Sequence, residues 1–145
     1  MLMNDKQVAV NDVIVRLREA SDHYAHAAHA LSEPQLSEPF EARARACSDA
    51  AAGLEPHIRR LGELPRRPDP EREALEQILT RIGASIGSHE RSRFLQALGE
   101  REAAVEQAAG DALLQPLPED TLAEMRRIRT TAREQKSHLA GMQSD

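Results

Sequence analysis

The sequence predicts an all-α protein, an antiparallel four-helix bundle forming a single domain over residues 1–145 with its core at about 5–140. Three observations lead to this fold class. Alanine (23 residues) and leucine (16) dominate the apolar residues, whereas valine, isoleucine and threonine together number 15, and this balance favours helix over strand. Apolar residues recur at alternating steps of three and four along four segments. Clusters of proline and glycine separate these segments.

The first helix is predicted over residues 5–31. Asn4 suits the N-cap position, and Gln7, three residues further on, can complete a capping box. Apolar or small residues of this helix form one narrow stripe, with the spacing of a bundle seam. The stripe comprises Val10, Ile14, Leu17, Ser21, Tyr24, Ala28 and Leu31.

The second helix is predicted to begin after Ser37 as its N-cap, with Pro39 in the first turn, and to end at Gly62. Pro56 removes one hydrogen bond inside this helix. Because the apolar stripe keeps its phase across Pro56, we expect a kink and not a break. Cys47, the only cysteine, lies on the stripe and is interpreted as a small apolar filler. The stripe comprises Phe40, Ala44, Cys47, Ala51, Leu54, Ile58 and Leu61.

The connection to the third helix is the longest one and is predicted to contain an extra helical segment. Residues 63–68 are rich in proline and arginine and form a linker. Asp69 can cap a segment that reaches residue 86, close to Gly83 and Gly87. Whether residues 70–114 form one bent helix or two stays open. A crossover in this connection would give the connectivity of ferritin-like folds.

The third and fourth helices are predicted over 89–114 and 119–140, the fourth ending at Gly141. The third stripe comprises Leu95, Leu98, Glu102, Val105, Ala109 and Ala112. The fourth comprises Leu122, Met125, Ile128, Ala132, Gln135 and Leu139.

Several short segments resemble one known family. They are Asn11-Asp12-Val13-Ile14, Tyr24-x-x-Ala27-Ala28, Arg60-Leu61-Gly62-Glu63-Leu64-Pro65, Glu102-Ala103-Ala104-Val105 and His138. On these segments the chain resembles the bacterial family called domain of unknown function 2383 along nearly its whole length. It departs at residues 86–88, where Ile-Gly-Ser replaces a Gly-Gly-Asp type of loop. The resemblance implies a ferritin-like four-helix bundle and no established reaction.

A ferritin-like bundle raises the question of a di-iron centre. Such a centre needs an inward Glu from each of two helices and a Glu-x-x-His from each of the other two. The stripes of the first two helices contain no carboxylate. The third offers only Glu102, and the fourth offers Gln135-x-x-His138, in which a neutral amide replaces the Glu. We therefore expect no di-iron centre, no metal ligands and no cofactor.

Glu102 lies on an apolar stripe, where an unpaired charge would be costly. One interpretation is a metal or proton site. The other is a structural carboxylate that binds the Tyr24 hydroxyl, the Gln135 amide or Arg129. Because buried acids are usually paired, the second is favoured, and it predicts a hydrogen bond between Glu102 and one of these three residues.

Three histidines, His23, His26 and His29, repeat every third residue in the first helix. Neighbours at this spacing share a face and suit Zn, Cu or Ni. However, a turn of ~100° per residue places His23 and His26 opposite the apolar stripe and His29 at its flank. The cluster is therefore predicted to face solvent, and no cysteine or further acid completes a closed site.

Composition and motifs exclude several classes of function. A net charge of −5 and 2% aromatic residues disfavour nucleic-acid binding. No apolar run is long enough to cross a membrane, and no secretory signal is evident, so a cytoplasmic location is expected. Phosphate-binding loops and nucleophile motifs are missing. We therefore expect no catalytic residues and no enzymatic activity.

The expected function is that of a non-enzymatic ferritin-like bundle acting through self-association or partner binding. A homo-oligomer is expected, with a protein partner as a further possibility. The alternative is a metal-binding or metal-storage protein that uses the histidines of the first helix, or Glu102 with His138. Apolar residues outside the stripes are candidates for an oligomer face: Val8, Val13, Val15, Leu79 and Leu114.

Overall fold

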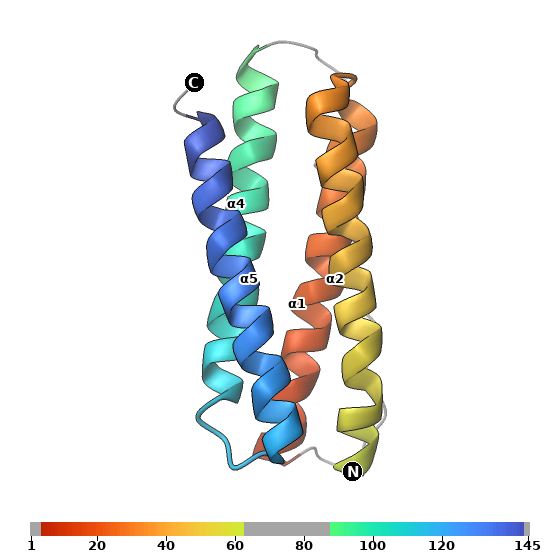
Figure 1. Ribbon diagram of the computed structural model, residues 1–145, viewed down its shortest axis with the longest axis vertical. Helices are drawn as coiled ribbons and strands as arrows, with labels where there is room; N and C mark the ends of the chain where they lie inside the picture. The colour runs from red at the N-terminus through yellow and green to blue at the C-terminus, as the bar shows by residue number, and fades with distance from the viewer. Residues whose placement is uncertain (1–3, 63–87, 144–145) are drawn as a thin grey trace.

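A computed structural model describes residues 4–62 and 88–143 of the chain. These residues form four α-helices and no strand, which confirms the all-α fold class (Figure 1). The helices are α1 (Asp5–Ala30), α2 (Pro34–Arg60), α4 (Ser88–Ala112) and α5 (Glu119–Gln143). The helical segment predicted at 69–86, and with it the number of helices in 70–114, lies outside the described residues.

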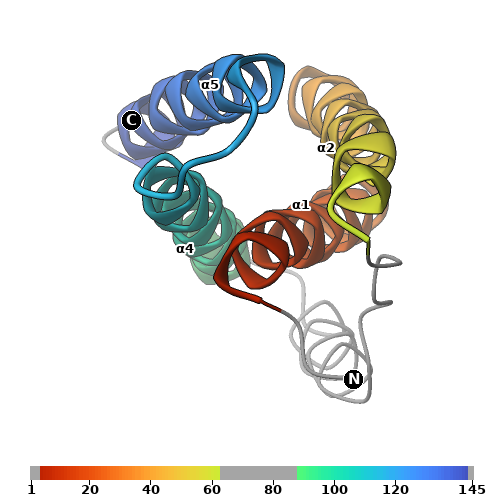
Figure 2. The same cartoon turned by 90° about the horizontal axis from the view of Figure 1, so that it is seen from below.

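The four helices lie side by side as a bundle. In Figure 1, the start of α1, the end of α2, the end of α4 and the start of α5 lie at the same, lower end. The end of α2 and the start of α4 therefore lie at opposite ends of the bundle. Figure 2 shows that α1 lies between α2 and α4, and that α5 lies on the other side of α4. The α1–α2, α1–α4 and α4–α5 seams are closely packed, whereas α2 and α5 touch much less.

The predicted start of the first helix and the predicted end of the second are present. The Asn4 side chain accepts a hydrogen bond from the Gln7 backbone N–H (2.9 Å), and the Gln7 side chain accepts one from the Asn4 N–H (2.7 Å). This capping box is tied to the end of α2, because Gln7 Nε2 donates to the Leu61 carbonyl (2.5 Å). Gly62 follows with φ of +89°, the left-handed conformation that ends a helix.

The start of α2 differs from its prediction. The helix begins at Pro34, so Ser37 is not its cap and Pro39 lies inside it. Proline is favourable at the first helical position, and the additional turn buries Leu36 beside Phe40. The helix continues through Pro56 without a break, as predicted.

The end of α5 also differs from its prediction. The helix does not end at Gly141 but continues to Gln143. Gly141 has no positive φ, so it is an ordinary helical residue. The additional residues bring Met142 against the apolar residues at that end of the bundle.

In the part of the chain that the structure describes, the apolar core consists of two clusters along the bundle axis. The larger one includes Leu17, Leu54 and Val105, and the smaller one includes Phe40 and Leu98. Nearly all of the predicted stripe residues are buried, and the exceptions, Ser21, Leu31, Leu61, Leu122 and Gln135, are partly buried. On α4, Glu102 lies between Leu98 of one cluster and Val105 of the other. The two apolar clusters therefore meet at a charged residue.

Candidate functional site

Glu102 forms the centre of a buried polar cluster with residues from two other helices. Its carboxylate is 0% exposed. The Tyr24 hydroxyl donates to Oε2 (2.5 Å), which confirms one of the three predicted partners. Arg43 donates from Nε to Oε2 and from Nη2 to Oε1, both at 2.8 Å. The cluster therefore joins α1, α2 and α4 through a two-pronged ion pair and a hydroxyl.

Arg43 is the partner that the sequence analysis missed. It precedes the stripe residue Ala44, so helical phase places it at the edge of the apolar face. Its long apolar stem lets the guanidinium reach inward from that edge, and only 10% of the side chain is exposed. The sequence feature that points to such a partner is the acid itself, because a carboxylate on an apolar stripe favours a cation from a neighbouring helix.

A second contact explains why Tyr24 and Arg43 lie at the same level. Ser21 Oγ donates to the Ala44 carbonyl at 2.8 Å, which aligns α1 with α2 at this point. Tyr24 also packs edge-on against Phe40, with ring centroids 5.7 Å apart. The tyrosine is therefore fixed by packing on one side and by the carboxylate on the other.

The neighbouring groups stay protonated at neutral pH. Burial raises the pKa of the Tyr24 hydroxyl well above its ordinary value, and the charge of Glu102 raises it further. Burial also raises the pKa of the Cys47 thiol to about 12. Cys47 is fully buried, so it fills space in the core and supplies no thiolate.

The residues considered for metal binding are not brought together. Glu102 is fully buried, whereas His138 is exposed. Gln135 and Arg129 are not hydrogen-bonded to Glu102, whose two oxygens bind Tyr24 and Arg43. Across residues 4–62 and 88–143, no three His, Cys, Asp or Glu side chains form a group that could hold a metal ion.

The histidines of α1 do not share one exposed face. His26 is partly buried and His29 is exposed, but His23 is only 6% exposed, so its predicted solvent-facing position was wrong. The physical reason is that α1 packs against α4 as well as α2, which widens its buried face beyond the single stripe. Neither ring nitrogen of His23 has a hydrogen-bond partner.

Burial of His23 predicts a specific pH dependence of stability. Burial, followed by the charges of Arg101 and His26, lowers its pKa from 6.5 to about 4. Between these values the unfolded chain binds a proton that the folded chain does not, so stability falls as the pH decreases through this window. Urea denaturation at pH 6.5 and at pH 4 measures how far the free energy of unfolding falls between them. We expect this fall to be about 1–2 kcal/mol smaller for His23→Leu than for the wild type.

The exposed His29 provides the matched control for this measurement. His29→Leu should keep the pH dependence of the wild-type protein. Identical pH dependence in the wild type and in His23→Leu would contradict the assignment of a buried, neutral His23.

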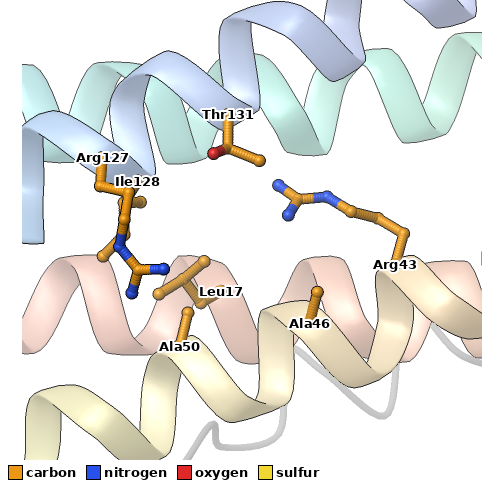
Figure 3. Close-up of a pocket in the computed structure, with 7 residues that line it drawn as sticks. All are labelled: Leu17, Arg43, Ala46, Ala50, Arg127, Ile128 and Thr131. Atoms are coloured by element: carbon orange, nitrogen blue, oxygen red, sulfur yellow. The ribbon is translucent and has the colours of Figure 1, made fainter.

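A slot opens at the seam between α2 and α5. Its volume is about 110 Å³. Figure 3 shows Arg43 and Thr131 facing each other across one end of the slot, with Arg127 at the other end. Between these polar groups lies an apolar wall, and the slot reaches α1 at Leu17. The apolar lining consists of Leu17, Ala46, Ala50 and Ile128.

Polar contacts hold the same seam together near the end of α2. His57 Nδ1 lies 2.6 Å from Thr121 Oγ1, and Arg60 donates to Asp120 at 2.8 Å. Closer to the start of α2, the small side chains of its alanines leave the space that forms the slot. The slot therefore connects the surface of the bundle with the buried cluster through Arg43, which belongs to both.

A second surface feature lies at the end of the bundle where α1 begins. Val8 is 51% exposed and Leu114 is 82% exposed, and they are the exposed large apolar residues of the described chain. Val8 lines a hollow of about 360 Å³ between α1 and the end of α4, and Leu114 directly precedes Gln115 of its lining. Asp5, Asp12 and Asp111 also line this hollow.

The other residues expected on an oligomer face have different positions. Val13 is 0% exposed, so its predicted place on a surface was wrong. It is buried for the same reason as His23, because α1 has packed neighbours on two sides. Val15 is partly buried, and Leu79 lies outside the described residues.

Comparison with known proteins identifies the family of the chain and nothing about its chemistry. No curated protein and no solved structure matches the sequence. No helix in the described part of the chain has the length and apolar character needed to span a membrane. One family, described as "Domain of unknown function (DUF2383)", matches residues 7–115, about three quarters of the chain. The chain therefore belongs to the DUF2383 family, as its resemblance predicted.

Proposed function

We propose that this chain is a non-enzymatic association protein with a ferritin-like bundle, in which neighbouring helices are antiparallel. The positions of the helix ends support this fold, because the end of α2 and the start of α4 lie at opposite ends of the bundle. A long crossover between the second and third main helices is the connectivity of ferritin-like folds.

The observation on which the proposed function rests is the apolar end surface formed by Val8 and Leu114. Both side chains are large, apolar and exposed; Val8 lines the hollow, and Leu114 is the chain neighbour of Gln115, which also lines it. Grouped exposed apolar residues with a polar rim are typical of protein interaction sites. The buried charges of Glu102 and Arg43, in contrast, satisfy each other inside the bundle and present no reactive group there.

Charge around the hollow favours a protein partner over a second copy of the chain. Asp5, Asp12 and Asp111 line it, and Asp12 is paired with Arg16 at 3.3 Å. Two copies that met at this surface would bring like charges together, which is unfavourable. A partner segment with an apolar side chain surrounded by Lys or Arg fits both the shape of the hollow and the negative charge around it.

The experiment compares association of the wild type with that of the double variant Val8→Ser/Leu114→Ser. Light scattering measures self-association, and calorimetry measures binding of an amphipathic helical peptide made of Leu and Lys. We expect the double variant to bind the peptide at least about tenfold more weakly, equivalent to about 1.4 kcal/mol. Higher salt should weaken wild-type binding because the rim is acidic.

Gln96→Ser is the control, because Gln96 is exposed on α4 away from this end. It should associate like the wild type. A peptide that binds the double variant as tightly as the wild type, without any difference in self-association, would contradict the proposal.

A further inference from the structure

We propose that the α2–α5 slot binds a short-chain aliphatic carboxylate. Its carboxylate group would lie between Arg43 and Thr131, and its hydrocarbon part would lie against the apolar wall of the slot. This site is separate from the end surface of Val8 and Leu114, and it rests on different observations.

The chemistry of Arg43 is the first argument. Its Nε and Nη2 atoms bind Glu102, so Nη1 is not part of the ion pair. The guanidinium lies at the slot wall although the side chain is nine-tenths buried. A carboxylate is the strongest acceptor of a guanidinium.

The charges that line the slot are the second argument. Thr131 supplies a hydroxyl opposite Arg43, and Arg127 supplies a second guanidinium at the other end (Figure 3). Among the residues that the structure describes, no acidic side chain lines the slot. Glu102 lies behind Arg43, fully buried, and Glu124 binds Arg127 from outside the lining. An anion in the slot therefore faces hydrogen-bond donors at both ends and no carboxylate in the lining.

The apolar wall and the volume set the size of the ligand. Leu17, Ala46, Ala50 and Ile128 provide a surface without hydrogen-bonding side chains. An engineered cavity of about 150 Å³ accepts benzene, which has six heavy atoms. The volume of about 110 Å³ therefore suits about four to six non-hydrogen atoms, the size range from acetate to butyrate.

The test is a titration of the full chain with sodium butyrate, followed by the amide signals of the protein in two-dimensional NMR. Butyramide has the same shape without the charge, and sodium chloride has the same ionic strength without the hydrocarbon part. We expect butyrate to shift the amides of Ala46, Ala50 and Thr131 in a saturable way. Butyramide and chloride should bind at least about tenfold more weakly.

Two variants on the same helix distinguish the slot from a general effect. Ala46→Leu places a larger side chain in the slot and should weaken butyrate binding at least tenfold. Ala52→Leu makes the same change at an exposed position of α2 that does not line the slot, so it should bind like the wild type. Thr131→Val keeps the side-chain shape, removes the hydroxyl and should weaken binding several-fold.

Three results would overturn the proposal. The first is a set of butyrate shifts no larger than those caused by butyramide or chloride. The second is unchanged binding by Ala46→Leu. The third is a set of shifts that map to the end surface of Val8 and Leu114 and leave α2 and α5 unaffected. Because Ala46 is an exposed helical residue, its replacement tests the slot without removing a core contact.

Discussion

Replacement of Arg43 by methionine is expected to lower the free energy of unfolding by about 3–5 kcal/mol. Methionine keeps much of the apolar stem but removes the guanidinium. The Glu102 carboxylate, which is 0% exposed, would keep only the hydroxyl of Tyr24 as a partner. Loss of one member of a buried ion pair is costly because the remaining charge is neither paired nor hydrated. Urea denaturation of the single variant and the wild type measures the loss.

The double variant Arg43→Met/Glu102→Gln separates the lost charge from lost packing. Glutamine has nearly the shape of glutamate, and its carbonyl can still accept the hydrogen bond from Tyr24. We expect the double variant to recover most of the stability, because neutral replacement of a buried pair is often nearly neutral. A surface ion pair contributes less than about 1 kcal/mol to the free energy of unfolding. A loss of that size or smaller in Arg43→Met would contradict the assignment of a buried ion pair.

Replacement of Leu54 by alanine is expected to lower the free energy of unfolding by about 2–5 kcal/mol. Leu54 on α2 is 0% exposed and belongs to the larger apolar cluster. Its truncation removes apolar contacts and leaves a cavity that the surrounding side chains fill only in part. The transition should remain cooperative, with its midpoint at a lower urea concentration.

Leu114→Ala is the matched control, because the same chemical change is made at a residue that is 82% exposed. Its effect should stay within about 0.5 kcal/mol. Equal losses at the two positions would contradict the assignment of Leu54 to the core and of Leu114 to the surface.

Local patterns in the sequence were sufficient to predict the helices and most of the core. Asn4 and Gln7 predicted the start of α1, and steps of three and four predicted the buried residues of α2 from Phe40 to Ile58. Caps and stripes depend on neighbours within one or two turns, so a single sequence contains them. The predicted start of α2 at Ser37 and the predicted end of α5 at Gly141 were wrong. Burial of Leu36 extends α2 at its start, and packing of Met142 extends α5 at its end.

The candidate sites depend on contacts between helices, and the sequence alone predicted them less well. The pattern of α4 showed that Glu102 needed a partner but could not supply Arg43, which lies 59 residues away in the chain. His23 and Val13 were assigned to the surface because a single stripe describes a helix with one packed side. In the structure α1 packs against two helices, and only their arrangement in space reveals the second buried face.

The polar cluster of Tyr24, Arg43 and Glu102 also has a consequence for the alignment of the helices. Small, similar apolar residues such as alanine would allow one helix to slide along another by a turn, about 5.4 Å, with little change in burial. A shift of that size in α1, α2 or α4 would separate Glu102 from at least one partner and leave a charge unpaired in the core. The cluster thereby selects one alignment of these three helices along the bundle axis. In contrast, α5 contributes nothing to the cluster and is positioned by packing and by polar contacts of its own with α2 and α4.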